Sequence, residues 1–129
     1  MSLLLDTQVL LWLFLRSTSI KKAVRGILAD QENTVYASAV STWEIAIKSG
    51  LGKLELPGAP AHYLPDRIQR AGLMILPIVP AHTYGVFSLP AHHRDPFDRL
   101  LIAQAQVESL TVVTNDRIFA KYDVKRIAA

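Results

Sequence analysis

Short apolar runs alternate with helical patterns along the whole of this 129-residue chain. The runs lack the alternation of polar and apolar residues that marks a strand with one wet face, so we expect both faces of each strand to be covered. Strands that alternate with helices in this way predict an α/β fold, here a three-layer α/β/α sandwich with a central parallel sheet. The predicted strands are Leu3–Leu5, Thr34–Ser38, Leu73–Ile78 and Leu110–Thr114, with Val124–Ile127 as a candidate fifth strand.

Helical patterns fill the intervals between the apolar runs. The clearest is Pro96–Ser109, in which Phe97, Leu101 and Ala105 share one face. Two prolines and a glycine between positions 56 and 60 predict a loop. The other predicted helices are Thr7–Leu15, Ile20–Ala29, Ser41–Ser49, Ala61–Ala71, Ala81–Ser88 and Arg117–Tyr122. We find no linker or repeat and expect one domain over residues 1–129, a length that suits a single domain.

The composition narrows the function classes. Hydrophobic residues make up 50% of the chain and charged residues 19%, which is typical of an ordered globular protein and suggests that a partner or a second copy covers some apolar surface. The absence of cysteine excludes disulfides, thiolate metal sites and cysteine nucleophiles, and is compatible with the reducing cytoplasm. The apolar stretch Leu3–Leu15 is too short to span a bilayer and is interrupted by Asp6, so we expect neither a membrane span nor a signal peptide.

Four carboxylates lie where predicted strands end or the following helices begin. The carboxyl ends of parallel strands meet at one edge of the sheet, where ligands of such folds bind, so these side chains can converge. Clustered carboxylates repel one another unless a cation screens them, and an all-oxygen set suits Mg²⁺ or Mn²⁺. Such ions stabilise the oxygens of a phosphodiester during hydrolysis. The four residues are Asp6, Glu44, Asp98 and Asp116.

Three of the four acids also suit purely structural positions at helix starts. Ser41 and Glu44 have the spacing of a capping box, in which Glu44 would only close the first turn. Asp95 at an N-cap, followed by proline, would place Asp98 at the third helical position. Asp116 can cap the last predicted helix. For these residues the capping and metal-binding interpretations both stay open.

Asp6 differs from the other three because the sequence requires no cap there: it is a charge between two apolar runs at a strand end. This favours a functional role. A phosphate-accepting, receiver-like domain would use Asp6 as a nucleophile and would need a second acid two residues later, but that position is Gln8. The nucleophile alternative is therefore weaker than the metal site.

Four longer segments resemble one group of PIN-domain nucleases, the toxins of VapC-type toxin–antitoxin systems. They read LLLDTQVLLWLF, SAVSTWEIAIKSGLGKLELP, LPAHHRDPFDRLLIAQAQ and LTVVTNDRIFAKYDV, and together they cover nearly the whole chain. The resemblance implies a metal-dependent endoribonuclease that hydrolyses RNA with Mg²⁺ or Mn²⁺. It also implies a homodimer and a cognate antitoxin protein that blocks the site.

The resemblance also implies roles for individual residues. The catalytic and metal-binding acids of the family fall on Asp6, Glu44, Asp98 and Asp116. Supporting positions, which bond to carboxylates or water, fall on Thr7, Asp95 and Thr114. Candidate RNA contacts are Gln8, His93, Arg94 and Arg99.

One position departs from the pattern. Relatives of this group commonly have histidine where this chain has Gln8, which lacks a titratable nitrogen. The departure supports an alternative function, a non-catalytic PIN-fold module that binds RNA or protein, although all four acids are present. None of the four histidines has a zinc-type spacing, so we expect surface positions or substrate contacts for them rather than metal ligation.

Overall fold

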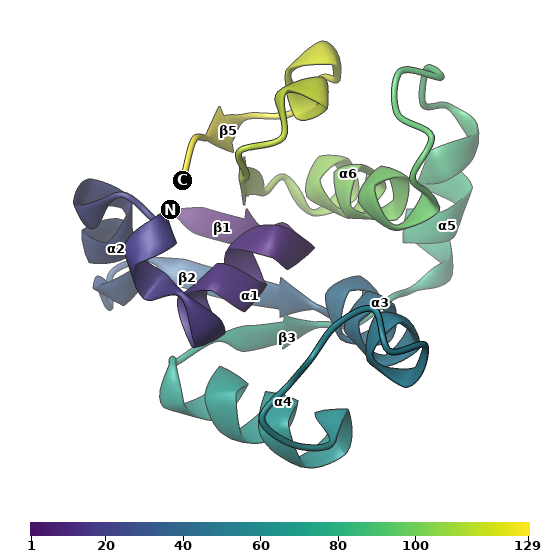
Figure 1. Cartoon of the computed structure of the whole chain (residues 1–129). Coiled ribbons are helices and arrows are strands. Elements are labelled where there is room, and N and C mark those ends of the chain that lie inside the picture. The colour runs from purple at the N-terminus through teal and green to yellow at the C-terminus, as the bar shows by residue number, and fades with distance from the viewer.

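A five-stranded, wholly parallel sheet forms the centre of the molecule, and this computed structural model describes all residues 1–129 (Figure 1). The strand order is β3-β2-β1-β4-β5, so β1 lies in the middle and pairs with β2 on one side and β4 on the other. Leu4 of β1 pairs with Tyr36 of β2 and with Val112 of β4. The strands are β1 Ser2–Leu5, β2 Thr34–Ser38, β3 Met74–Leu76, β4 Thr111–Val113 and β5 Arg126–Ile127.

Helices cover both faces of the sheet, which confirms the predicted three-layer α/β/α sandwich. Side chains of α1, α2 and α4 form the hydrophobic core on one face, whereas α6, with α5 packed against it, covers the other face. Figure 1 shows α3 beyond the arrowheads of the central strands, at the carboxyl edge. The helices are α1 Thr7–Leu15, α2 Lys22–Ala29, α3 Ala39–Gly50, α4 Pro60–Arg70, α5 Pro80–Phe87 and α6 Pro96–Glu108, with short 3-10 helices η1 Ser17–Ser19 and η2 Arg117–Lys121.

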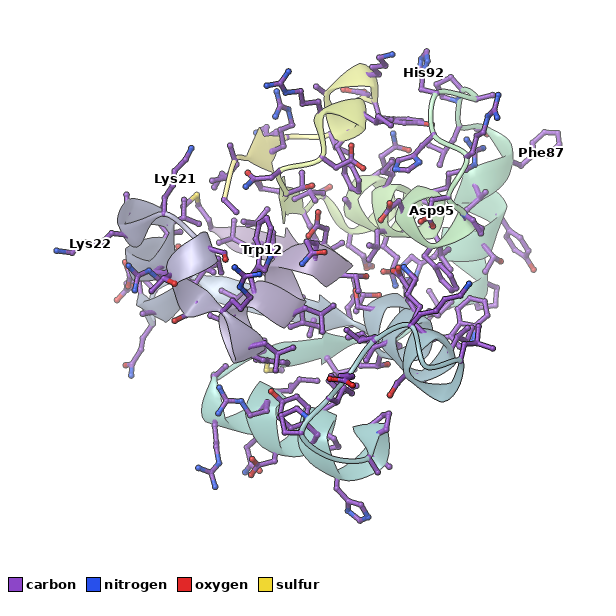
Figure 2. The ribbon with its side chains drawn as sticks, viewed as in Figure 1. Trp12, Lys21, Lys22, Phe87, His92 and Asp95 are labelled. Atoms are coloured by element: carbon purple, nitrogen blue, oxygen red, sulfur yellow. The ribbon has the colours of Figure 1, made fainter.

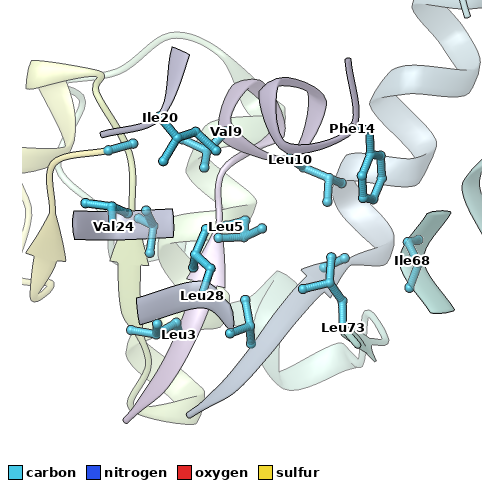
Figure 3. Close-up of a cluster of buried hydrophobic side chains, with 14 of the residues drawn as sticks. Leu3, Leu5, Val9, Leu10, Phe14, Ile20, Val24, Leu28, Ile68 and Leu73 are labelled. Carbon is cyan, nitrogen blue, oxygen red and sulfur yellow. The ribbon is translucent and has the colours of Figure 1, made fainter. Parts of the chain in front are cut away.

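The strand residues divide between two cores because successive side chains of a strand point to opposite faces. Leu3 and Leu5 enter the core with α1 and α2, drawn in Figure 3, whereas Leu4 between them enters the core with α6. All three leucines have no exposed surface. Burial on both faces explains why the strand sequences show no polar alternation, as a parallel sheet between helices requires.

Several element boundaries differ from the sequence prediction. Helix α3 begins at Ala39 and not at Ser41, because Ser38 is its N-cap and its hydroxyl accepts a hydrogen bond from the Val40 amide (2.9 Å). Helix α2 begins at Lys22, after the separate turn η1. The last predicted helix is the 3-10 helix η2. No helix is both long enough and apolar enough to cross a membrane.

A candidate metal centre at the carboxyl edge of the sheet

A cavity of about 530 Å³ lies beyond the carboxyl ends of the central strands. The chain changes direction across the sheet here, because β2 and β3 lie on one side of β1 and β4 and β5 lie on the other. Ligands of parallel α/β folds bind at such a switch point. The cavity wall includes all four predicted acids and three further predicted residues: Asp6, Glu44, Asp98, Asp116, Thr7, Gln8 and Asp95.

Asp6, directly after β1, is only 5% exposed. Its Oδ1 accepts a hydrogen bond from the Val9 amide (2.7 Å), which makes Asp6 the N-cap of α1. The expectation that Asp6 has no capping role was therefore wrong: the helix begins one residue after the strand ends, so the same carboxylate can do both. Its Oδ2 accepts a short hydrogen bond from the Thr114 hydroxyl, which ties the ends of β1 and β4 together.

Glu44 reaches the cavity from the second turn of α3, and the predicted capping box with Ser41 is wrong because the helix starts earlier. The hydroxyl of Ser41 instead pairs with that of Thr7 (2.9 Å). Glu44 Oε2 forms an ion pair with Lys48 one turn later, and this hydrogen bond raises the pKa of Lys48. Glu44 Oε1 is buried and has no hydrogen-bond partner.

The N-terminus of α6 and the turn after β4 contribute the remaining acids. Asp95 is the N-cap of α6, where its Oδ1 accepts from the amides of Phe97 (2.8 Å) and Asp98 (3.3 Å), as predicted. Asp116 caps η2 by accepting from the Ile118 amide (2.9 Å), which was also predicted. Capping uses one oxygen each of Asp95 and Asp116, so it does not prevent Asp116 from facing the cavity.

Burial is the main electrostatic influence on Asp6. It raises the pKa of this carboxyl above its usual range, against hydrogen bonds from Thr114 and Val9 that lower it. The charges of Asp116 and Glu44 raise it further. The net direction is upward, so Asp6 lies where its own negative charge is disfavoured.

Asp98 shows the same effect more strongly. Burial, and next the nearby Asp95 carboxylate, raise the pKa of Asp98 to about 7. Glu44 and Asp6 add to the rise, whereas His93 opposes it. The carboxylates thus form an electrostatically unfavourable group that a bound cation would relieve.

The donor set fits a hard divalent cation. Oxygen ligands from carboxylates suit Mg²⁺ and Mn²⁺, and the chain has no cysteine thiolate that would favour a softer metal. The unpartnered Oε1 of Glu44 is the strongest indication that a cation binds here, since a buried carboxylate oxygen without a donor is costly in free energy. The candidate ligands on the cavity wall are Asp6, Glu44, Asp98 and Asp116, and ligand atoms of Asp98 and Asp116 lie within 4.8 Å of each other and of a ring nitrogen of His93.

The family model described as PIN domain matches residues 3–125. This chain belongs to the PIN domain family. The family resemblance of the four segments is thereby confirmed. A curated relative, Ribonuclease VapC16 from Mycobacterium tuberculosis, is 48% identical over 59 residues, which are 46% of this chain and 42% of that protein. The match spans less than half of the length of that relative.

Solved structures share the architecture of this PIN domain. The crystal structure of FitAcB from Neisseria gonorrhoeae is 26% identical, with a TM-score of 0.65 over 98% of this chain and 96% of that chain. The crystal structure of VapBC2 from Rickettsia felis bound to a DNA fragment from its promoter has a TM-score of 0.76 at 19% identity, over 98% of both chains. At that identity the second likeness concerns the fold alone.

The predicted RNA contacts of the PIN domain lie in different environments. Gln8 is exposed and lines the cavity. Arg94 is exposed on the loop before α6. The guanidinium of Arg99 donates instead to backbone carbonyls, among them that of Pro90 (2.9 Å), so it holds the chain before α6 in place. His93 contacts two of the acids, and its side chain is only 11% exposed.

Sequence reasoning missed two features of this region. Lys48 lies on the cavity wall, and its position four residues after Glu44 is the helical spacing of an ion pair, which was a usable signal. The expectation of a surface or substrate-contact position was wrong for His82, which is 1% exposed. Its Nδ1 accepts a hydrogen bond from the Val79 amide (3.1 Å), and no sequence pattern marked that position.

Proposed function

We propose that this PIN domain is a metal-dependent endoribonuclease and the toxin of a toxin–antitoxin pair. The observation that carries the proposal is the convergence of four carboxylates from distant parts of the chain on one cavity, where one buried oxygen, Oε1 of Glu44, lacks any partner. The relative named a ribonuclease supports RNA as the substrate. We assign the ion as Mg²⁺ or Mn²⁺ and the site of action as the cytoplasm.

The residues of the site would have three roles: metal binding, orientation of the acids and contact with RNA. Asp6, Glu44, Asp98 and Asp116 hold the ion, which when bound supplies positive charge to a phosphodiester group. Thr114 orients Asp6 through its hydroxyl, and Thr7 pairs with Ser41 beneath the cavity. Gln8 and Arg94 are exposed and would contact RNA, Arg94 through phosphate groups.

Ribonuclease activity is tested by cleavage of RNA by the purified protein with Mg²⁺, with Mn²⁺ and with excess EDTA. EDTA should abolish cleavage and added Mn²⁺ should restore it, because the carboxylates alone supply no positive charge. Undiminished cleavage in excess chelator would contradict the metal mechanism. Binding of RNA without cleavage under any of these conditions would instead support the alternative that the domain is a non-catalytic binding module.

Partners are proposed from exposed apolar surface and from structural relatives that were solved as toxin–antitoxin complexes. Trp43 is 52% exposed and Phe87 is 94% exposed, and Figure 2 shows Phe87 projecting away from the body of the molecule. Large apolar side chains that stay exposed offer surface that a partner could cover. We propose a homodimer and a cognate antitoxin protein. Light scattering at micromolar concentration tests the dimer, and co-purification with the product of a neighbouring gene tests the antitoxin.

A further inference from the structure

His93 enters the acidic site from the loop that precedes α6. Its Nε2 forms a hydrogen bond with Asp116 Oδ2 (3.0 Å) and lies 3.0 Å from Asp98 Oδ2. The three atoms lie within 4.8 Å of one another, which is close enough for a shared metal ion. The side chain can therefore be either a metal ligand or a hydrogen-bond donor to two carboxylates.

The other ring nitrogen decides between these roles. The backbone amide of Asp95 donates a hydrogen bond to Nδ1 of His93 (3.2 Å). A nitrogen that accepts an N–H carries no proton, so the ring proton is on Nε2, which is then a donor. Metal coordination through Nε2 would require that proton to move to Nδ1, where it would face the Asp95 amide hydrogen. The contact with Asp95 therefore favours the donor role.

The loop that carries His93 is held from two sides. The His93 amide donates to the Tyr122 hydroxyl (2.7 Å), which in turn donates to the Pro90 carbonyl (2.8 Å). Arg99 of α6 donates to the same carbonyl (2.9 Å) and to others nearby. The ring of Phe119 packs edge-on against the imidazole, with centroids 6.1 Å apart. These contacts fix both the backbone and the ring of His93, whereas the neighbouring His92 points outward (Figure 2).

We propose that His93 is a positioning residue of the acidic site, whose Nε2–H binds Asp116 and holds it beside Asp98. The inference rests on the proposed function, because it takes those carboxylates to be the ligands of the ion. A donor outside the coordination shell that orients a metal-binding carboxylate typically contributes roughly ten- to hundredfold to metal affinity. His93 is thus a counterpart to Thr114, which holds Asp6 in the same way.

Titration calorimetry with Mn²⁺ alone, without RNA, tests this role on three variants. His93→Ala should weaken Mn²⁺ binding by roughly tenfold or more. His93→Gln places an amide N–H near the position of Nε2 and should bind within about threefold of the unmodified protein. His92→Ala is the matched control from the same loop and should bind within about twofold. Unchanged binding by His93→Ala, or a His93→Gln protein as weak as His93→Ala, would overturn the proposal.

A nitrogen NMR spectrum of the histidine rings of the unmodified protein tests the proposal even if His93→Ala does not fold. His93 should show a protonated Nε2 and a bare Nδ1, both without metal and with saturating Mg²⁺. An Nε2 without a proton, either before or after Mg²⁺ is added, would show that His93 is not the donor. If the unmodified protein binds neither ion, the proposed function fails, while the metal-free spectrum still decides whether His93 donates to the acids.

Discussion

Two groups of polar side chains lie near the carboxyl ends of the strands, and they are built in opposite ways. The acidic site consists of Asp6, Glu44, Asp98 and Asp116. The second group, here called the neutral network, consists of Ser38, Gln104 and His82, each at most 1% exposed. In the neutral network the Ser38 hydroxyl donates to Gln104 Oε1 (2.5 Å), and Gln104 Nε2 lies 3.3 Å from both the Pro77 carbonyl and His82 Nδ1.

The difference shows what each group contributes. In the neutral network the three side chains contact one another through donor–acceptor pairs that link β2, α5 and α6, and only His82 Nε2 is buried without a hydrogen-bond partner. The acids meet mainly like charges, and the pKa values of Asp6 and Asp98 are raised as a result of burial and repulsion. We conclude that the neutral network stabilises the fold, whereas the acidic site lowers the stability of the metal-free protein and gains from a cation.

The largest expected effect is the loss of RNA cleavage in Asp6→Asn. Asparagine still caps a helix, so α1 should remain intact. The negative charge is lost, and removing one group that acts directly in stabilising the reaction typically lowers the rate by about 10²–10³-fold. Cleavage assays with Mn²⁺ measure the effect, and circular dichroism checks the fold. A folded variant with near-normal cleavage would show that the acidic site is not the active site.

Gln104→Leu should have the opposite effects: a lower stability of the fold and no change in metal binding. It leaves the Ser38 hydroxyl and the Pro77 carbonyl without their partner, and each buried unpaired group costs about 1–3 kcal/mol, so we expect the free energy of unfolding to fall by about 2–4 kcal/mol. Mn²⁺ affinity of the folded protein should not change. Denaturant unfolding measures the loss, with Gln106→Leu on the exposed side of α6 as the control. Equal losses in both variants would show that the hydrogen bonds of the neutral network contribute no more to the free energy of unfolding than an exposed glutamine does.

Asp98→Asn should stabilise the metal-free protein at pH 8. The folded pKa of about 7 exceeds the unfolded value of 3.8, so between these values the folded state binds more protons, and stability rises as the pH falls from 8 toward 4. One pKa unit corresponds to about 1.4 kcal/mol, and the lost interaction with the α6 dipole opposes the gain. We therefore expect the free energy of unfolding of Asp98→Asn at pH 8 to be about 1–3 kcal/mol higher than that of the unmodified protein.

The same variant should lose most of this pH dependence, together with cleavage and part of its Mn²⁺ affinity. Melting curves in EDTA between pH 5 and pH 8, compared with the unmodified protein, measure the effect. If Asp98 serves only the helix terminus, the variant should instead be less stable by about 0.3–1 kcal/mol and cut RNA normally. The sign of the change therefore separates the two interpretations of this residue.

Lys48→Met should have the smallest effect. The lysine ammonium neutralises Glu44 in the metal-free protein, so its loss should lower stability by about 0.5–1 kcal/mol. It should also tighten Mn²⁺ binding by about threefold to tenfold, because a competing positive charge leaves the site. Arg70→Met, which breaks the exposed pair with Asp66 on α4, is the matched control and should not alter Mn²⁺ affinity. Weaker Mn²⁺ binding by Lys48→Met would contradict this role.

The fold was predictable because its signals are local. Apolar runs such as Leu3–Leu5 predicted strands buried on both faces, and the caps at Asp95 and Asp116 follow from residue type and position. The start of α3 was predicted wrongly, at Ser41, because Ser41 and Glu44 have the spacing of a capping box. Ser38 is the N-cap instead, and the Ser41 hydroxyl pairs with that of Thr7, a contact that no local pattern shows.

By itself, the sequence determined the strand–helix order, the α/β class and the set of acids that can meet at the carboxyl edge, since these depend on residue type and short spacings. The tertiary structure decided which side chains occupy the same space. It brought His93 between Asp98 and Asp116, turned Arg99 toward backbone carbonyls and left Glu44 Oε1 unpaired. Such contacts join residues far apart in the chain, and their energies depend on burial and distance, which no local pattern encodes.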